Sequence, residues 1–119
     1  MFIILSSIQV LATEHGYEKW ANFPHEREKL INLIQRKKNV LILSGDRHRG
    51  AIYKHNKIIE ITASSLNKPG SSDKETDKLM RGRIHKEINY GILVIKEDAL
   101  DIQLKNNDGT ILESATMSL

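Results

Sequence analysis

The sequence predicts an α/β fold, and three observations support this prediction. Residues 2–5 and 40–43 are short, uninterrupted apolar runs, which are typical of strands buried on both faces of a parallel sheet. An amphipathic stretch lies between these runs, so the order is strand, helix, strand, as in a βαβ unit. The pattern then changes to short strands separated by turn residues. We therefore expect a βαβ unit followed by a hairpin and an antiparallel meander, with residues 40–43 inside the sheet beside residues 2–5.

The helix of this unit is expected to begin at Pro24, after a polar and aromatic loop. Proline is favoured at the first helical position, and Glu26 lies where the helix dipole favours negative charge. Apolar residues follow at spacings of three and four, at Leu30, Ile31 and Ile34. They predict one apolar face, which we expect to cover one face of the sheet.

The middle of the chain is expected to form a hairpin and then a long loop. Residues 51–53 and 57–62 have strand character and are separated by a short polar turn. Residues 66–88 contain a Pro-Gly-Ser-Ser run followed by mixed charges, which is typical of a surface loop. A short helix is expected within this loop, near residues 76–80.

The end of the chain is expected to form a three-strand antiparallel meander. Its strands are predicted at residues 90–95, 99–104 and 110–114. Asn-Asp-Gly at residues 107–109 supplies the tight turn between the last two strands. No internal repeat or linker is visible, so we expect a single domain over residues 1–119.

The composition is that of a globular chain with a modest positive charge. Of the 119 residues, 39% are hydrophobic and 28% are charged, with a net charge of +3. This excess can attract anions such as phosphates, but it is too small to indicate nucleic-acid binding. The chain has no cysteine, which excludes disulfides, thiolate catalysis and cysteine-based zinc sites. It has no apolar run of about 18 residues, so a transmembrane helix is not expected. Its apolar start lacks the basic residue that precedes a signal-peptide core, so a signal peptide is not expected either.

The most informative segment is residues 40–48, Val-Leu-Ile-Leu-Ser-Gly-Asp-Arg-His. In α/β sheets, ligands bind just beyond the carboxyl ends of the strands. Gly45 permits a sharp turn there, after which Asp46 and His48 can face a common point. A carboxylate and an imidazole two residues apart can serve as ligands of a divalent or trivalent metal.

The neighbouring residues leave the role of this turn open. Arg47 and Arg49 flank the two candidate ligands and could add positive charge near a phosphate. The alternative is that Asp46 caps the turn and His48 is an ordinary surface residue. The preceding strand and the glycine favour the metal site without deciding between these readings.

Other polar residues carry weaker signals. Four further histidines lie in expected loops or at the ends of elements, so we expect them at the surface: His15, His25, His55 and His85. Ser64 and Ser65 follow a strand, but no activating base is identifiable beside either, so a serine nucleophile is not expected. The chain also lacks a P-loop or a Gly-x-Gly-x-x-Gly pattern.

Seven short motifs in order along the chain resemble the alkaline phosphatase D (PhoD-like) family of metallophosphatases. They are Ser6-Ser-Ile-Gln9, Glu18-Lys-Trp20, Asn22-Phe-Pro24, Glu26-Arg27, Ser44-Gly-Asp-Arg-His48, Ile61-Thr-Ala-Ser-Ser-Leu66 and Asn89-Tyr-Gly91. The resemblance covers essentially the whole chain. It implies a calcineurin-like phosphoesterase sandwich that hydrolyses phosphomonoesters and phosphodiesters at a metal centre, with calcium and iron as the metals. The family's Gly-Asp-x-His motif carries the role of metal ligand over to Asp46 and His48, and it assigns no catalytic or substrate-binding residue.

The chain departs from the family pattern in what it lacks. The earlier motifs, which supply the bridging Asp and further ligands, are absent, so the chain resembles only the C-terminal portion of such an enzyme. Two ligands cannot fill the coordination sphere of a hard metal, which takes about six. We therefore expect a fragment, or the product of a split or truncated gene, that is inactive without its missing N-terminal half. Family members are often exported, but no segment of this chain indicates a compartment.

Two alternatives from other classes remain open. The chain could be a non-catalytic remnant whose core survives without chemistry, or a small basic nucleic-acid-binding module. The second is less favoured because the aromatic residues are few and no basic stripe interleaves with them.

The inherited metal site would have a defined geometry. The Asp46 and His48 side chains are expected on the same side of the turn, with their oxygen and nitrogen atoms within about 4–6 Å of each other. The place is expected to be open to solvent, and Ser64 and Ser65 are expected nearby.

Overall fold

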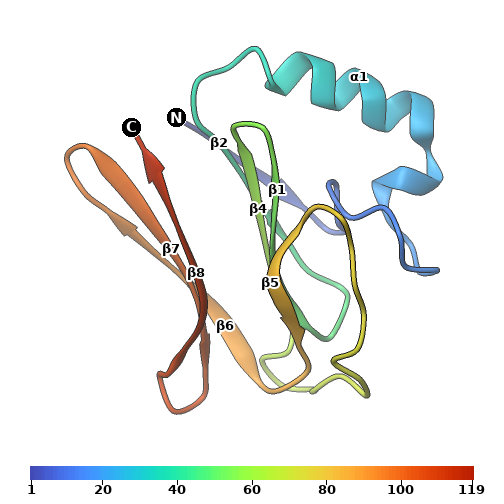
Figure 1. Ribbon diagram of the computed structural model, residues 1–119, viewed down its shortest axis with the longest axis vertical. Helices are drawn as coiled ribbons and strands as arrows, with labels where there is room; N and C mark the ends of the chain where they lie inside the picture. Colours follow the sequence, from blue (N-terminus) through green and yellow to red (C-terminus); the bar gives the residue numbers. More distant parts are fainter.

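The computed structural model describes all 119 residues and contains two β-sheets and one α-helix. Figure 1 shows the helix on one side of the first sheet and the second sheet on the other. The elements in chain order are β1 (Phe2–Ser6), η1 (Trp20–Asn22, a 3₁₀ turn), α1 (Pro24–Ile34), β2 (Val40–Ser44), β3 (Gly50–His55), β4 (Ile58–Ala63), β5 (Met80–His85), β6 (Asn89–Ile95), β7 (Ala99–Asn106) and β8 (Ile111–Ser118).

The first sheet has the strand order β1-β2-β4-β3-β5. β1, β2 and β4 run parallel, with Phe2 opposite Val40 and Val40 opposite Ile58. β3 is antiparallel to both β4 and β5, so the expected hairpin is formed by β3 and β4. The prediction that residues 40–43 lie inside the sheet beside residues 2–5 is confirmed, as is the α/β fold class.

Alternation along β2 divides the core into two layers. Val40 and Ile42 face α1, where they pack with Ile31 and Ile34. Leu41 faces the opposite way and packs against the second sheet. This is the period-two alternation of a strand, applied to a strand that is buried on both faces.

The second sheet is the expected meander, β6-β7-β8, antiparallel throughout. Leu100, Ile102 and Leu104 of β7 are fully buried and cover the face of the first sheet that α1 leaves free. The last strand extends over Ile111–Ser118, further than the predicted residues 110–114.

The prediction that residues 2–5 are buried on both faces is wrong. β1 pairs only with β2 and forms an edge, so Phe2 is 51% and Leu5 78% exposed. An apolar run favours burial, but burial also needs a neighbouring strand, and none pairs with the outer side of β1.

The predicted loop at residues 66–88 contains the strand β5, and the short helix expected near residues 76–80 is absent. The Asp77 carboxylate accepts the amides of Thr13 and Glu14, and the Asp77 carbonyl accepts the amide of Met80 in a tight turn. The chain therefore turns at Asp77 and enters a strand, since these contacts with a distant segment outweigh a weak local helix signal. No helix in the structure combines the length and the apolar character required to cross a bilayer, and α1 has 11 residues.

Candidate functional site

The turn that follows β2 lies where the parallel strands end. Ser6 of β1, Ser44 of β2 and Thr62 of β4 lie opposite one another near the carboxyl ends of their strands. Residues 45–49 then lead into β3. This is the edge at which open α/β sheets bind ligands, as the sequence predicts.

The backbone of this turn is unusual at both candidate ligands. Asp46 and His48 adopt the left-handed region, with φ of 70° and 50°. For residues other than glycine such conformations cost of order 1–3 kcal/mol each and are found preferentially at functional sites. Both side chains are exposed, whereas the alternate residues Arg47 and Arg49 are buried. Neither Asp46 nor His48 forms a side-chain hydrogen bond, so Asp46 does not cap the turn.

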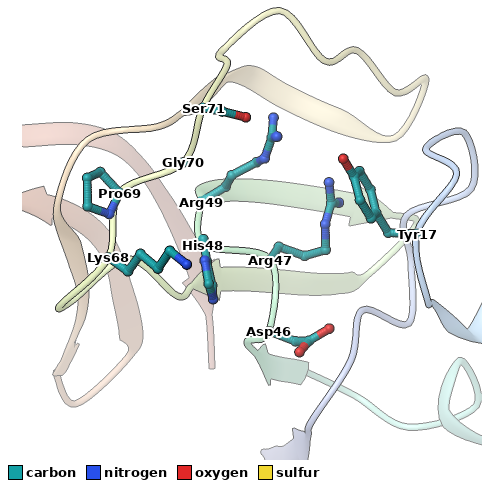
Figure 2. A pocket seen from close by; sticks show the side chains of 9 residues that line it. All are labelled: Tyr17, Asp46, Arg47, His48, Arg49, Lys68, Pro69, Gly70 and Ser71. Carbon is teal, nitrogen blue, oxygen red and sulfur yellow. The ribbon is translucent and has the colours of Figure 1, made fainter.

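Asp46 and His48 line a cleft of about 300 Å³. Its other walls come from the N-terminal loop, the two arginines of the turn and the loop after β4: Tyr17, Arg47, Arg49, Lys68, Pro69, Gly70 and Ser71. In Figure 2 the Lys68 side chain extends toward His48, while the Asp46 carboxylate extends away from the His48 ring. The expected spacing of about 4–6 Å between an Asp46 oxygen and a His48 nitrogen stays a prediction.

The residues present do not make up a complete metal site. No group of three or more His, Cys, Asp or Glu side chains is arranged to hold a metal ion. Asp46 and His48 would supply one oxygen and one nitrogen, whereas hard cations such as Ca²⁺ take six to eight ligands.

Arg47 lines the cleft, and the expectation that it adds positive charge near a phosphate stays a prediction. Its guanidinium donates to both carboxylate oxygens of Glu75, at 3.1 and 2.6 Å, and to the Gln9 side-chain oxygen at 2.9 Å. It also lies over the Tyr17 ring, with 4.9 Å from Cζ to the ring centroid. Arg47 is therefore committed to partners inside the protein.

Arg49 is also held by the chain rather than left free. Its guanidinium donates to the Ser72 carbonyl oxygen at 2.7 Å and lies 3.6 Å from the Glu75 carboxylate. Both arginines thus fasten the loop after β4 to the turn. The sequence did not reveal these ion pairs, because Glu75 lies 26 or more residues away on a segment whose path has no local signal.

A buried polar network lies behind Arg47, centred on Gln9. The Gln9 side-chain oxygen accepts from Arg47 and from His15 Nε2, at 2.9 and 2.8 Å, and the Gln9 amide nitrogen donates to Thr62 at 2.8 Å. Because the Tyr17 amide donates to His15 Nδ1, the neutral His15 ring carries its proton on Nε2. Burial, and then the charge of Arg47, lower the pKa of His15 to about 4.

Two predicted surface histidines are therefore buried. His15 belongs to the Gln9 network, and His85 is 2% exposed, with Nε2 2.9 Å from a Glu113 oxygen. Their positions at element ends suggested the surface. The sequence did not show the surrounding groups that bury them, such as Arg47 near His15 and Glu113 beside His85. His25 is exposed and His55 is partly exposed.

Glu60 holds the segment next to Gln9 in place, a role that was not predicted from the sequence. It is fully buried in β4 and accepts the backbone amides of Val10 and Leu11, the closer contact being 2.6 Å. Arg27 of α1 donates to the carbonyl oxygens of the same two residues. Burial raises the pKa of the Glu60 carboxyl. These contacts fix the segment that carries Gln9. The one sign of this role in the sequence is a single acidic residue within the apolar run Ile-Ile-Glu-Ile.

Ser64, the first residue after β4, lies close to the turn, as expected. A Cβ placed on Gly45 would lie 3.9 Å from the Ser64 Cβ. The Ser64 hydroxyl donates to the Arg49 carbonyl oxygen at 2.9 Å, so it supports the turn. Ser65 is fully buried, and no hydrogen bond joins either serine to a histidine.

The fold is similar to portions of longer solved proteins. GAP50, the anchor in the inner membrane complex of Plasmodium, matches 98% of this chain over 36% of its own length, with a TM-score of 0.79 and 10% identity. PhoD matches 98% of this chain over 28% of its own length, with a TM-score of 0.69 and 15% identity. A conserved uncharacterised protein of Streptococcus pneumoniae, described as a predicted phosphoesterase, matches 82% of this chain over 49% of its own length, with a TM-score of 0.49 and 15% identity.

No family model and no curated protein matches the sequence. The chain spans about a third of the length of GAP50 and less than a third of PhoD. At these identities the likeness concerns the fold. The chain therefore has the fold of a portion of PhoD, in agreement with the family whose motifs it resembles.

Proposed function

We propose that the chain is one part of a metal-dependent phosphoesterase and contributes Asp46 and His48 to its metal centre. The observation that carries this proposal is the turn after β2. It presents two ligand-type side chains that are exposed, unbonded within the chain and held in left-handed conformations where the parallel strands end. The likeness of the fold to PhoD supports the same reading.

The chain's own residues define what this part contributes. Asp46 and His48 would hold a metal, calcium or iron by the family resemblance, and this metal would act as a Lewis acid on a phosphate ester. Arg47 and Arg49 keep the turn in shape through Glu75. The remaining ligands would come from a second segment, so the isolated chain is expected to be inactive.

The outer edge of β1 is the proposed docking place for that second segment. Phe2, Ile3 and Leu5 are exposed, although strands of parallel sheets are usually covered on both faces. Beyond Leu5 an apolar hollow continues the same edge, lined by Leu5, Ser6, Ser7, Ile8, Trp20, Phe23 and Glu26. We assign this edge to a strand that runs beside β1 and extends the sheet, because GAP50 and PhoD share this fold within chains about three times as long.

A second candidate function is a non-catalytic module of the same fold. It is favoured by the absence of any group of three ligand-type side chains, and by the likeness to GAP50, which is described as an anchor. In that case Asp46 and His48 would be remnants of an ancestral site.

Reconstitution separates these candidates. The chain alone is assayed with p-nitrophenyl phosphate and its bis-ester in the presence of calcium, iron, zinc or magnesium, and no appreciable turnover is expected. The chain is then produced together with the polypeptide encoded immediately upstream. Turnover that needs both parts and is lost with Asp46→Asn would support the phosphoesterase. Turnover by the isolated chain would contradict the incomplete site, and an inactive pair that nevertheless forms a complex would favour the non-catalytic module.

A further inference from the structure

The charged side chains of the cleft fall into two groups. Arg47 and Arg49 are buried and bonded to Glu75, Gln9 or Ser72. Lys68 is exposed and forms no ion pair or hydrogen bond through its ammonium group, although it lines the same cleft. The arginines therefore serve the fold, and Lys68 is the cation left free for a ligand.

The backbone that carries Lys68 is fixed against the turn. A Cβ on Gly70 would lie 2.6 Å from the His48 carbonyl oxygen and 3.2 Å from Arg49 Cγ, so only glycine permits this close approach. The Gly70 amide donates to the Lys86 carbonyl oxygen at 2.8 Å. Lys68 is thus a flexible side chain on a firmly attached backbone, and Figure 2 shows it reaching toward His48.

The walls of the cleft retain a positive charge. Two arginines share the single carboxylate of Glu75, so their charge is only partly compensated. Lys68 adds a further positive charge, and Asp46 is the one acidic residue that lines the cleft. Such a surface attracts anions, and an ammonium group with three donors binds phosphate oxygens as a point charge.

We propose that Lys68 binds the phosphate group of an ester in this cleft, next to the place where Asp46 and His48 would hold a metal. The identity of the anion rests on the proposed phosphoesterase function. The binding itself requires no metal, since Lys68 and the arginine wall supply the positive charge.

The test is a titration of the metal-free chain with phenyl phosphate in the presence of a chelator, followed by amide NMR shifts. The amide signals of residues 46–49 and of Lys68, Gly70 and Ser71 are expected to move together. Lys68→Met should weaken binding about tenfold or more, and Lys68→Arg should retain most of it. Lys78→Met is the matched control, because Lys78 is exposed on the same loop but does not line the cleft, and it should change affinity less than about twofold.

The outcomes separate this proposal from the proposed function. Equal weakening by Lys68→Met and Lys78→Met, or no shift near the turn, would mean diffuse surface binding and would overturn the Lys68 site. Asp46→Asn should leave metal-free binding intact or tighten it, while it abolishes turnover in the reconstituted pair. An inactive pair with Lys68-dependent binding would therefore refute the enzyme and keep the anion site. In an active pair, an unchanged KM in Lys68→Met would refute the anion site and keep the enzyme.

Discussion

The two edge strands of the first sheet, β5 and β1, differ in which side chains cover them. β5 exposes Arg81 and Arg83, and the Glu113 carboxylate of β8 crosses to it, accepting the Arg83 amide at 3.1 Å and contacting His85 Nε2 at 2.9 Å. β1 instead exposes Phe2 and Leu5 and has no charged residue over Phe2–Ser6.

We call β5 the finished edge, because charged groups cover it, and β1 the open edge, because its apolar side chains stay exposed. Natural sheets protect edges with charged side chains, irregular backbone or a covering segment, because a bare edge recruits further strands. β5 has all three features, including Gly82 at a φ of 70°. β1 has no charged residue of its own, and the Lys37 ammonium, 5.6 Å from the centre of the Phe2 ring, is the one charged group that lies over it. The exposed Leu5 side chain leaves the rest of this edge bare, which is the physical argument for a strand that joins it.

The largest expected effect is the loss of stability at the finished edge. In Gly82→Ala the new Cβ would push the end of the flexible Glu113 side chain away from the Arg83 amide and His85, and residue 82 would be strained at positive φ. We expect a decrease of about 2–4 kcal/mol in the free energy of unfolding. Denaturant unfolding of both proteins measures it, with Gly109→Ala as a control, because that glycine shares a positive φ but has no atom near its Cβ position. A loss no greater than in the control would show that Glu113 does not close this edge.

A smaller loss is expected when the crossing carboxylate is removed. Glu113→Ala leaves His85 Nε2 without its partner in a buried place, and Nδ1 already lacks one. An unpaired buried polar group costs about 1–3 kcal/mol. Thermal or denaturant unfolding measures this, and Glu97→Ala, at an exposed turn, should change stability by less than about 0.5 kcal/mol. If both variants were equally stable, the contact between β8 and β5 would make no contribution to the free energy of unfolding.

The smallest effect on stability is expected at the open edge. Leu5 is 78% exposed, so Leu5→Lys should change the free energy of unfolding by less than about 0.5 kcal/mol. The same change should weaken binding of the second segment proposed above, because a charge on an edge strand opposes strand addition. Co-purification and analytical ultracentrifugation measure the complex. Unimpaired assembly by the lysine variant would place the partner elsewhere.

The sequence predicted β2 and the turn well because their signals are local. A continuous apolar run followed by Gly45, Asp46 and His48 identifies both the strand and the place where chemistry would sit. β5 was missed because Arg-Gly-Arg has the composition of a loop, and its place in the sheet depends on pairing with β3.

The ion pairs at the candidate site were not predicted for a similar reason. The charge state of a cleft depends on which groups are already paired, and Glu75 reaches Arg47 and Arg49 through a loop without a regular pattern. Nothing local distinguished Lys68 from the other lysines. Only the close contact of Gly70 with His48 brings it to the cleft.

The alternation of buried and exposed residues in the turn has a consequence for assembly. Arg47 and Arg49 are anchored when the chain folds, so Asp46 and His48 take their left-handed conformations before any partner arrives. The backbone of the turn is therefore set in advance and loses little conformational entropy on association. Binding of the second segment proposed above is then expected to resemble rigid-body docking. Its observed rate should rise in proportion to protein concentration and should not reach a plateau set by loop ordering.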